Sequence, residues 1–314
     1  MAGPGQMRSR RSCFRAPSRE QYDGAVRPHK LPWQSKLVLL VVLPAVACGV
    51  LIDTQRALAS RPSTAAWVLG LSAALGALTL ALRAATPFAA LTGAVITAQL
   101  IYATCNWSHF VAWRTFLVPV LAVALLAHIA TRIGRAKKEK LGTAEAKLGR
   151  SASQVAANLG VAALLSTGLA ESLAVNSSWL LHSSAALLAA ALAAMAEAAA
   201  DTVSSEIGQV FGGRPRMIST MRAVEPGTDG GITLAGSLSG IAAAAIVAAL
   251  TAFALGADWQ LFKISLAGAV FGLFFDSLLG ATLERWGWLN NDGVNFLSTA
   301  SAAAFALFSI AALK

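Results

Sequence analysis

The feature that most constrains this chain is a series of apolar runs that recurs from residue 37 to the carboxyl end. A bilayer core about 30 Å thick requires roughly 20 predominantly apolar residues in helical form. Only helices and closed barrels satisfy every backbone polar group in that environment. We therefore predict an all-α fold, a polytopic transmembrane helical bundle of about nine spans.

Composition supports this fold class and argues against one partner. The chain of 314 residues is 56% hydrophobic and only 13% charged, outside the range of soluble globular proteins. Its net charge of +10 does not indicate nucleic-acid binding, because the basic residues flank the apolar runs, where they determine topology. The expected spans cover approximately 37–52, 65–82, 85–101, 110–129, 151–173, 179–200, 232–255, 262–283 and 295–314.

Basic segments give the expected orientation and domain division. Residues 1–36 are polar and basic, which predicts a disordered cytoplasmic tail. The loop 132–150 is strongly basic and is also placed in the cytoplasm. The four spans in 37–131 form a scaffold, and 132–314 is the motif-bearing transmembrane domain. We expect a multi-pass protein of the bacterial inner membrane; the oligomeric state stays open.

The chemically richest stretch runs from Glu197 to Gly231 and combines carboxylates, arginines and a glycine-threonine turn. The residues concerned are Asp201, Glu206, Arg214, Arg216, Arg222, Gly227, Thr228, Gly230 and Gly231. Carboxylates bind magnesium together with phosphate oxygens, arginines balance charge, and a glycine-rich turn that opens a helix offers N–H donors. The mixture suits a polyphosphate and its Mg²⁺. An ordinary charged loop between two spans is the alternative, and this stretch alone does not decide.

Helical geometry separates two of these carboxylates. Asp201 and Ser205 share one face of the preceding helix, whereas Glu206 is turned away from it. Glycines from Gly208 onward predict that the helix soon breaks, which would free Glu206 to join the others.

Further polar groups lie within or beside the spans. Asp276 falls inside a span, where an ionised carboxylate costs about 2.5–3.5 kcal/mol, so it must be paired, protonated or metal-bound. Gln154 and Asn158 are four residues apart and share a face, either joining helices or lining a polar pocket. A last group precedes and opens the final span, and a helix cap explains one of its members. This group comprises Asn290, Asn291, Asp292 and Asn295.

These groups are predicted to meet. With about nine spans, the loops 132–150, 200–231 and 284–293 fall on the same cytoplasmic face. Residues far apart in the sequence should therefore converge there.

Four motifs in this order support a family resemblance: GTAEAKLGRSASQVAANLGVAALL, ADTVSSEIG, VEPGTDGGITLAGSL and FDSLLGATLERWGWLNNDGVNF. Over roughly 130–314 the chain resembles the integral-membrane family catalogued as domain of unknown function 92, which includes the transmembrane protein 19 group and the plant phytyl-phosphate kinase. The resemblance implies a polyisoprenyl-type kinase. The stretch is also distantly similar to CTP-dependent dolichol and phytol kinases and to phosphatidate cytidylyltransferases. That similarity would place Asp201 and Glu206 in an acidic segment, and Gly227–Thr228 in the turn. Arg222 would match a basic position that is usually lysine in dolichol kinases.

The expected mechanism is phosphoryl transfer at the cytoplasmic face. Mg²⁺ held by Asp201, Glu206 and Asp276 would bridge the phosphates of CTP or ATP, while the arginines and the turn neutralise charge. The acceptor would be an isoprenoid or isoprenoid phosphate whose tail lies between helices. An acceptor phosphate needs no general base; an alcohol would need Asp276 or Asp292. A transporter or flippase of a lipid or small anion and a non-enzymatic scaffold are the alternatives.

Overall fold

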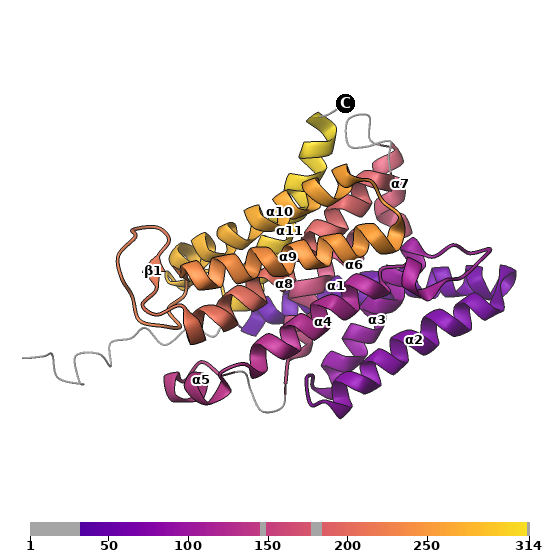
Figure 1. The fold of residues 1–314 in the computed structure, drawn as a ribbon. Coiled ribbons are helices and arrows are strands. Elements are labelled where there is room, and N and C mark those ends of the chain that lie inside the picture. The colour runs from indigo at the N-terminus through magenta and orange to yellow at the C-terminus, as the bar shows by residue number, and fades with distance from the viewer. Residues whose placement is uncertain (1–31, 145–148, 177–183, 313–314) are drawn as a thin grey trace, which may run out of the picture.

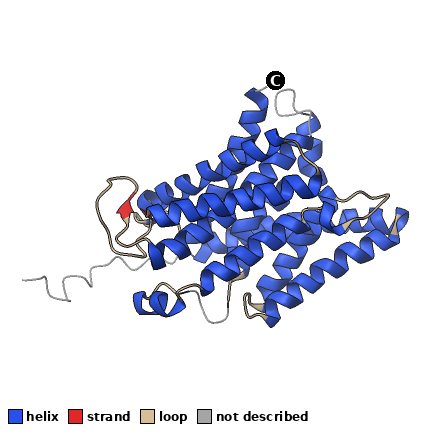
Figure 2. Cartoon of the chain, viewed as in Figure 1, coloured by secondary structure: helices blue, strands red, loops and turns tan. Residues whose placement is uncertain are grey.

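The computed structural model describes residues 32–144, 149–176 and 184–312. Within these ranges the chain is almost wholly helical, and the all-α prediction is confirmed (Figure 2). The described part contains one small antiparallel sheet, in which β1 (Arg216–Met217) pairs with β2 (Gly231–Ile232). Most of the expected amino-terminal tail lies outside the described residues, and residues 32–36 begin the first helix.

The remaining elements follow one another with short connections. They are α1 (Pro32–Ser60), α2 (Pro62–Ala81), α3 (Pro87–Thr104), η2 (Ala112–Arg114), α4 (Leu117–Arg132), α5 (Arg135–Leu141), α6 (Ala152–Leu165), α7 (Gly168–Asn176), α8 (Ser184–Phe211), α9 (Leu234–Leu255), α10 (Trp259–Leu279), the π-helical turn η3 (Gly280–Glu284) and α11 (Asn291–Ala312).

Seven of the described helices are long and apolar enough to cross a membrane, or eight if α4 and α5, which meet at 67°, form one broken span. The expected count of about nine is not reached, because the span expected at 151–173 divides between α6 and α7. Helix α6 has 14 residues. A helix of that length is roughly 21 Å long, short of a core about 30 Å thick. A polytopic helical membrane protein is thus confirmed, and the cytoplasmic amino terminus stays a prediction.

Helix α8 is the centre of the bundle. It packs against α4, α6, α9, α10 and α11, and its alanine-rich stretch from Ala189 to Ala200 is buried. Small side chains let the neighbouring backbones approach closely. A Cβ atom on Gly240 of α9 would lie 2.8 Å from the carbonyl oxygen of Ala200. The small residues at the start of α9 therefore serve helix packing at this position.

The break expected from the glycines occurs at Gly212, directly after α8 ends at Phe211, but Gly208 itself does not break the helix and Glu206 stays within it. The helix continues to Phe211 because Gly208 packs against the start of α9, where a Cβ atom would lie 3.0 Å from Thr233 Oγ1. The glycine here permits a close helix contact instead of ending the helix. The extended α8 delivers its polar residues to the end of the bundle that also holds β1 and α5, opposite α7 (Figure 1).

Gly240→Ala should lower the free energy of unfolding by about 1–3 kcal/mol, the usual cost of overpacking, because the added methyl group meets the backbone of α8. The measurement is the apparent melting temperature of the purified protein in detergent. Gly70→Ala in α2 is the matched control, since nothing lies within 4 Å of its Cβ position. Equal losses in both variants would contradict the packing role.

Candidate active site

A polar cavity of about 330 Å³ lies at the end of the bundle that carries the small sheet. The three loops expected to share one face all contribute to its lining, so their convergence is confirmed. Ten of the residues singled out in the sequence line it: Asn158, Asp201, Glu206, Gly227, Thr228, Gly230, Gly231, Asp276, Asn291 and Asn295.

Four residues singled out in the sequence are not part of this lining. Arg214, Arg216 and Arg222 are exposed on the segment between α8 and the turn. The guanidinium of Arg216 donates a hydrogen bond to the carbonyl oxygen of Met221 at 2.9 Å, within its own loop. Asp292 is buried in the first turn of α11. This geometry does not bring the three arginines to the cavity.

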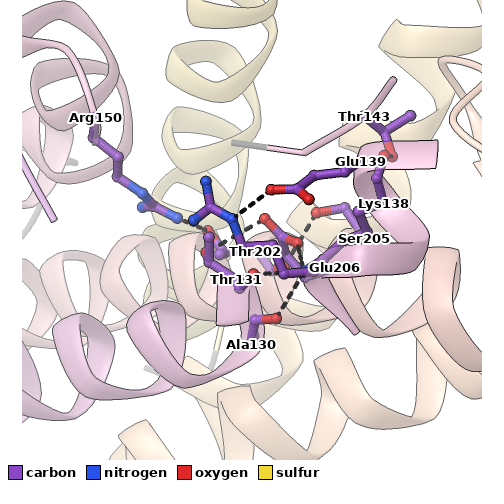
Figure 3. Close-up of polar contacts among 10 residues, drawn as sticks. Ala130, Thr131, Lys138, Glu139, Thr143, Arg150, Thr202, Ser205 and Glu206 are labelled. Atoms are coloured by element: carbon purple, nitrogen blue, oxygen red, sulfur yellow. Dashed lines mark hydrogen bonds and ion pairs between the residues drawn. The ribbon is translucent and has the colours of Figure 1, made fainter. Parts of the chain in front are cut away.

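Arg150 is the one cation in the described lining of the cavity, and the sequence placed it in the basic loop 132–150 without singling it out as a site residue. Its Nη2 donates to Thr202 Oγ1 of α8 at 3.4 Å, and its positive charge acts on Asp201 (Figure 3). The sequence feature that could have identified Arg150 as a site residue is its position directly before Ser151, the residue that caps α6. Ser151 and Gln154 form a capping box with hydrogen bonds of 3.2 and 2.7 Å, which fixes the start of α6 and hence Arg150.

Asp201 of α8 and Asp276 of α10 both line the cavity, where their carboxyl groups are close enough to interact electrostatically. Asp276 Oδ1 is buried and has no hydrogen-bond partner in the described structure. One turn deeper on α8, Glu197 is 1% exposed, and its Oε1 is likewise unpartnered. Ser298 of α11 lies near both Glu197 and Asp276, and its hydroxyl donates to the carbonyl oxygen of Asn295 at 3.0 Å. Adjacent buried carboxylates need a shared proton or a cation between them.

Glu206 faces the other side of α8. Lys138 of α5 donates its ammonium protons to Glu206 Oε2 and to the carbonyl oxygens of Ala130 and Thr131, the latter two at 3.0 and 2.7 Å. Thr131 Oγ1 adds a bond to Glu206 Oε1 at 3.3 Å, so both side chains converge on the carboxylate (Figure 3). Glu206 thus lines the cavity, but its charge is already balanced by Lys138.

The predicted set of three metal ligands is not assembled. Among the described residues, no three Asp, Glu, His or Cys side chains come together in a group that could hold a metal ion. Asp201 and Asp276 meet, whereas Glu206 is paired elsewhere. Magnesium is commonly held by one or two carboxylates together with substrate phosphates. The pair, with its unpartnered Asp276 oxygen, fits an ion that arrives with a polyphosphate.

The glycine turn forms a wall of the cavity. Gly227 and Gly230 have φ angles of 85° and 75°, in the left-handed region that favours glycine. The N–H groups of Thr228 and Gly231 donate to carbonyl oxygens inside the turn, at 3.2 and 2.9 Å, so these two are not available to an anion. The turn leads into the sheet before α9 begins at Leu234, so it does not open a helix directly.

Two further acidic residues, Asp229 and Glu284, line the cavity without having been singled out in the sequence. Desolvation raises the pKa of Asp229, and the nearby Arg285 opposes this effect. The only feature of the sequence that could have identified them is their position. Asp229 lies within the glycine turn, and Glu284 begins the loop before the last span.

Some of the asparagine side chains stabilise the fold, and others line the cavity. Asn290 Oδ1 accepts from Gly293 N at 2.9 Å, so it is the predicted helix cap, and its Nδ2 donates to Ser35 Oγ. Asn291 and Asn295, by contrast, line the cavity. Asn158 also lines it and donates to the carbonyl oxygen of Gln154 at 2.8 Å. Of the two roles expected for these amides on α6, the pocket-lining role is the one observed.

Comparisons with known proteins agree with the motifs. The model of the integral membrane protein family DUF92 matches residues 70–303. An uncharacterized membrane protein of Methanocaldococcus jannaschii is 41% identical over 108 residues, which cover 34% of this chain and 45% of that protein. One from Synechocystis is 32% identical over 204 residues, 62% of this chain and 73% of that protein. The chloroplastic protein VTE6 of Arabidopsis thaliana is 24% identical over 220 residues, 69% of this chain and 64% of that protein. No solved structure matches the chain.

Lys138→Met should destabilise the protein by about 3–5 kcal/mol, the usual cost of leaving one member of a buried ion pair alone, because Glu206 and two carbonyl groups lose their donor. The apparent melting temperature in detergent measures this loss. Adding Glu206→Gln to Lys138→Met should recover part of it, since no unpaired charge remains.

The exposed pair of Arg135 and Glu139, 3.0 Å apart, provides the control for this prediction. Glu139→Gln should change stability by no more than about 1 kcal/mol. If Lys138→Met proved as mild as this control, Glu206 would be free to serve the cavity directly.

Proposed function

Because the chain belongs to the integral membrane protein family DUF92, we propose that it transfers a phosphoryl group from a nucleoside triphosphate, CTP or ATP, to an isoprenoid phosphate in the membrane. The resemblance of its motifs to the plant phytyl-phosphate kinase group supports the choice of reaction. The observation that carries the proposal is the Asp201–Asp276 pair, with an unpartnered buried oxygen, beside Arg150 in a polar cavity.

The residues of the cavity have distinct roles in this reaction. Asp201 and Asp276 would hold magnesium, which when bound would neutralise negative charge on the phosphates of the donor. Arg150, oriented by its bond to Thr202, would contact an oxygen of the phosphoryl group. Asn158 and Asn295 supply hydrogen-bonding groups on either side. Positioning and charge stabilisation are the main requirements of phosphoryl transfer.

The reaction is a substitution at phosphorus. An oxygen of the acceptor phosphate attacks the terminal phosphorus of the donor, the bond to the bridging oxygen breaks, and the nucleoside diphosphate leaves with the electron pair. An acceptor phosphate is already anionic, so no general base is needed. The described lining of the cavity contains no histidine, which favours this acceptor over an alcohol. We further propose that the cavity opens to the cytoplasm of a bacterial cell, because the basic loop 132–150 contributes Thr143 and Arg150 to its lining.

Asp201→Asn, Asp276→Asn and Arg150→Gln should each reduce kcat at least about 100-fold, as expected when a group that stabilises the transition state is removed. The assay follows labelled phosphate from CTP, and separately ATP, to phytol, phytyl phosphate and a longer polyprenyl phosphate, with purified protein and magnesium. Arg214→Gln is the control, because Arg214 lies on the neighbouring exposed segment outside the cavity. No product with any pair from folded protein would reject the proposal and favour transport.

Removing divalent metal with a chelator should abolish transfer, and magnesium should restore it. Calcium should restore it poorly, since it requires more ligands and longer bonds than magnesium. The measurement is the initial rate against free magnesium concentration. Asp201→Asn should shift the half-saturating concentration upward, because one of the two carboxylates is lost. Full activity in metal-stripped protein would show that the carboxylate pair has another role.

A further inference from the structure

We infer that a second, apolar cavity binds the hydrocarbon tail of a single-chain lipid phosphate, with its head group at Arg150. This inference rests on the proposed function and assigns the acceptor a place. The cavity has a volume of about 340 Å³ and is lined mainly by α2, α3, α4 and α6, together with Arg135 of α5, Ala198 of α8 and the segments 82–85 and 149–150.

The walls of this cavity match a hydrocarbon chain. Alanine, valine and leucine side chains predominate, among them Leu75, Val123 and Leu159. The hydroxyls of Thr79 and Thr97 bond the carbonyl oxygens of their own helices, at 2.8 and 2.7 Å, so they present little free polarity. Moving a hydrocarbon chain from the bilayer to such a surface costs no hydrophobic free energy. A soluble anion would find no favourable interactions there.

The polar end of the same cavity matches an anionic head group. Every charged side chain in its described lining is an arginine: Arg83, Arg132, Arg135 and Arg150. These side chains lie at helix ends, beside the loops of the polar cavity. Arg135 pairs with Glu139, but none of the salt bridges between described residues involves the other three. Positive charge at the end of an apolar cavity complements a lipid phosphate and not a neutral lipid.

The two cavities adjoin at residues that would perform the transfer. Arg150 and Asn158 line both. Thr131 lines the apolar cavity, while its hydroxyl bonds Glu206 of the polar one. A head group at Arg150 would therefore have its tail on one side and the donor phosphates on the other. Transfer from a soluble donor to a membrane acceptor needs the reacting groups held together in this way.

The size of the cavity favours one chain over the two of a phospholipid. Its volume of about 340 Å³ is near the lower end of the usual range of ligand pockets. The small residues Gly93 on α3 and Ala124 on α4 leave the space that forms this cavity. Larger side chains at either position would fill it. At Gly93 a Cβ atom would meet only Val155, at 3.8 Å, so a longer side chain can enter the cavity without displacing backbone.

The first experiment is direct photolabelling with a long-chain prenyl monophosphate that bears a photoreactive group near the end of its tail. Labelled peptides should map to α3 and α4. Gly93→Leu and Ala124→Phe should each reduce labelling at least about tenfold, since the new side chain occupies the volume of the tail and overpacking the cavity costs at least about that factor. Gly70→Leu, at an open position of α2, should label like the natural chain.

Labelling needs no turnover, so it tests this inference even if no phosphoryl transfer is found. Labels confined to helices that do not line this cavity, or undiminished by Gly93→Leu and Ala124→Phe, would overturn it. Equal labelling by a two-chain phosphatidic acid probe would overturn the choice of a single chain.

Kinetics provide an independent test where transfer is observed. Gly93→Leu should reduce the ratio of kcat/KM for a long-chain acceptor to that for a water-soluble five-carbon prenyl phosphate at least about tenfold. An unchanged ratio would place the tail elsewhere while leaving the proposed reaction intact. Unchanged activity in Gly70→Leu confirms that the effect belongs to the cavity.

Discussion

The site depends on the continuity of α8. Because this helix runs unbroken from Ser184 to Phe211, the five residue steps from Asp201 to Glu206 direct these two side chains about 140° apart around its axis. Asp201 is thereby directed to Asp276 on α10, and Glu206 to Lys138 on α5. Alanine along the buried part of α8 and glycine on α9 make this possible, since they let the neighbouring helices pack closely enough to hold the helix straight.

The two faces of α8 differ in whether their charges are satisfied. Lys138 has three ammonium protons and three acceptors, two of which are carbonyl groups at the end of α4 that would otherwise lack partners. Glu206 therefore ties α5 to the bundle. Asp276 keeps a buried oxygen without a partner at the wall of the polar cavity, where such a group is costly. This contrast selects the Asp201–Asp276 pair, and not Glu206, as the part of the site left open to a ligand.

The sequence was sufficient for properties that depend on local composition. Hydropathy predicts the helical bundle, and the basic loops predict that distant polar residues share one face. It was insufficient where a residue's role depends on its partner. Gly208 resembles a helix breaker until the start of α9 is seen against it. Arg150 and Arg222 are equivalent as charges, but only Arg150 is fixed by a capping box at the cavity, while Arg222 is exposed. The short α6 could not be told from a full span, because α7 continues its apolar pattern.

The choice of arginine at position 150 suits its place between two unlike cavities. A guanidinium has several N–H groups in a fixed plane, so one can bond Thr202 while others remain directed to a second acceptor. A lysine would offer a single charged centre on a flexible stem and could not hold both contacts in a defined orientation. An enzyme that joins a soluble donor to a membrane acceptor must fix the head group of the acceptor at the boundary between water and hydrocarbon. Arg150 lies at such a boundary, because it lines both cavities and is held to α8 by its bond to Thr202.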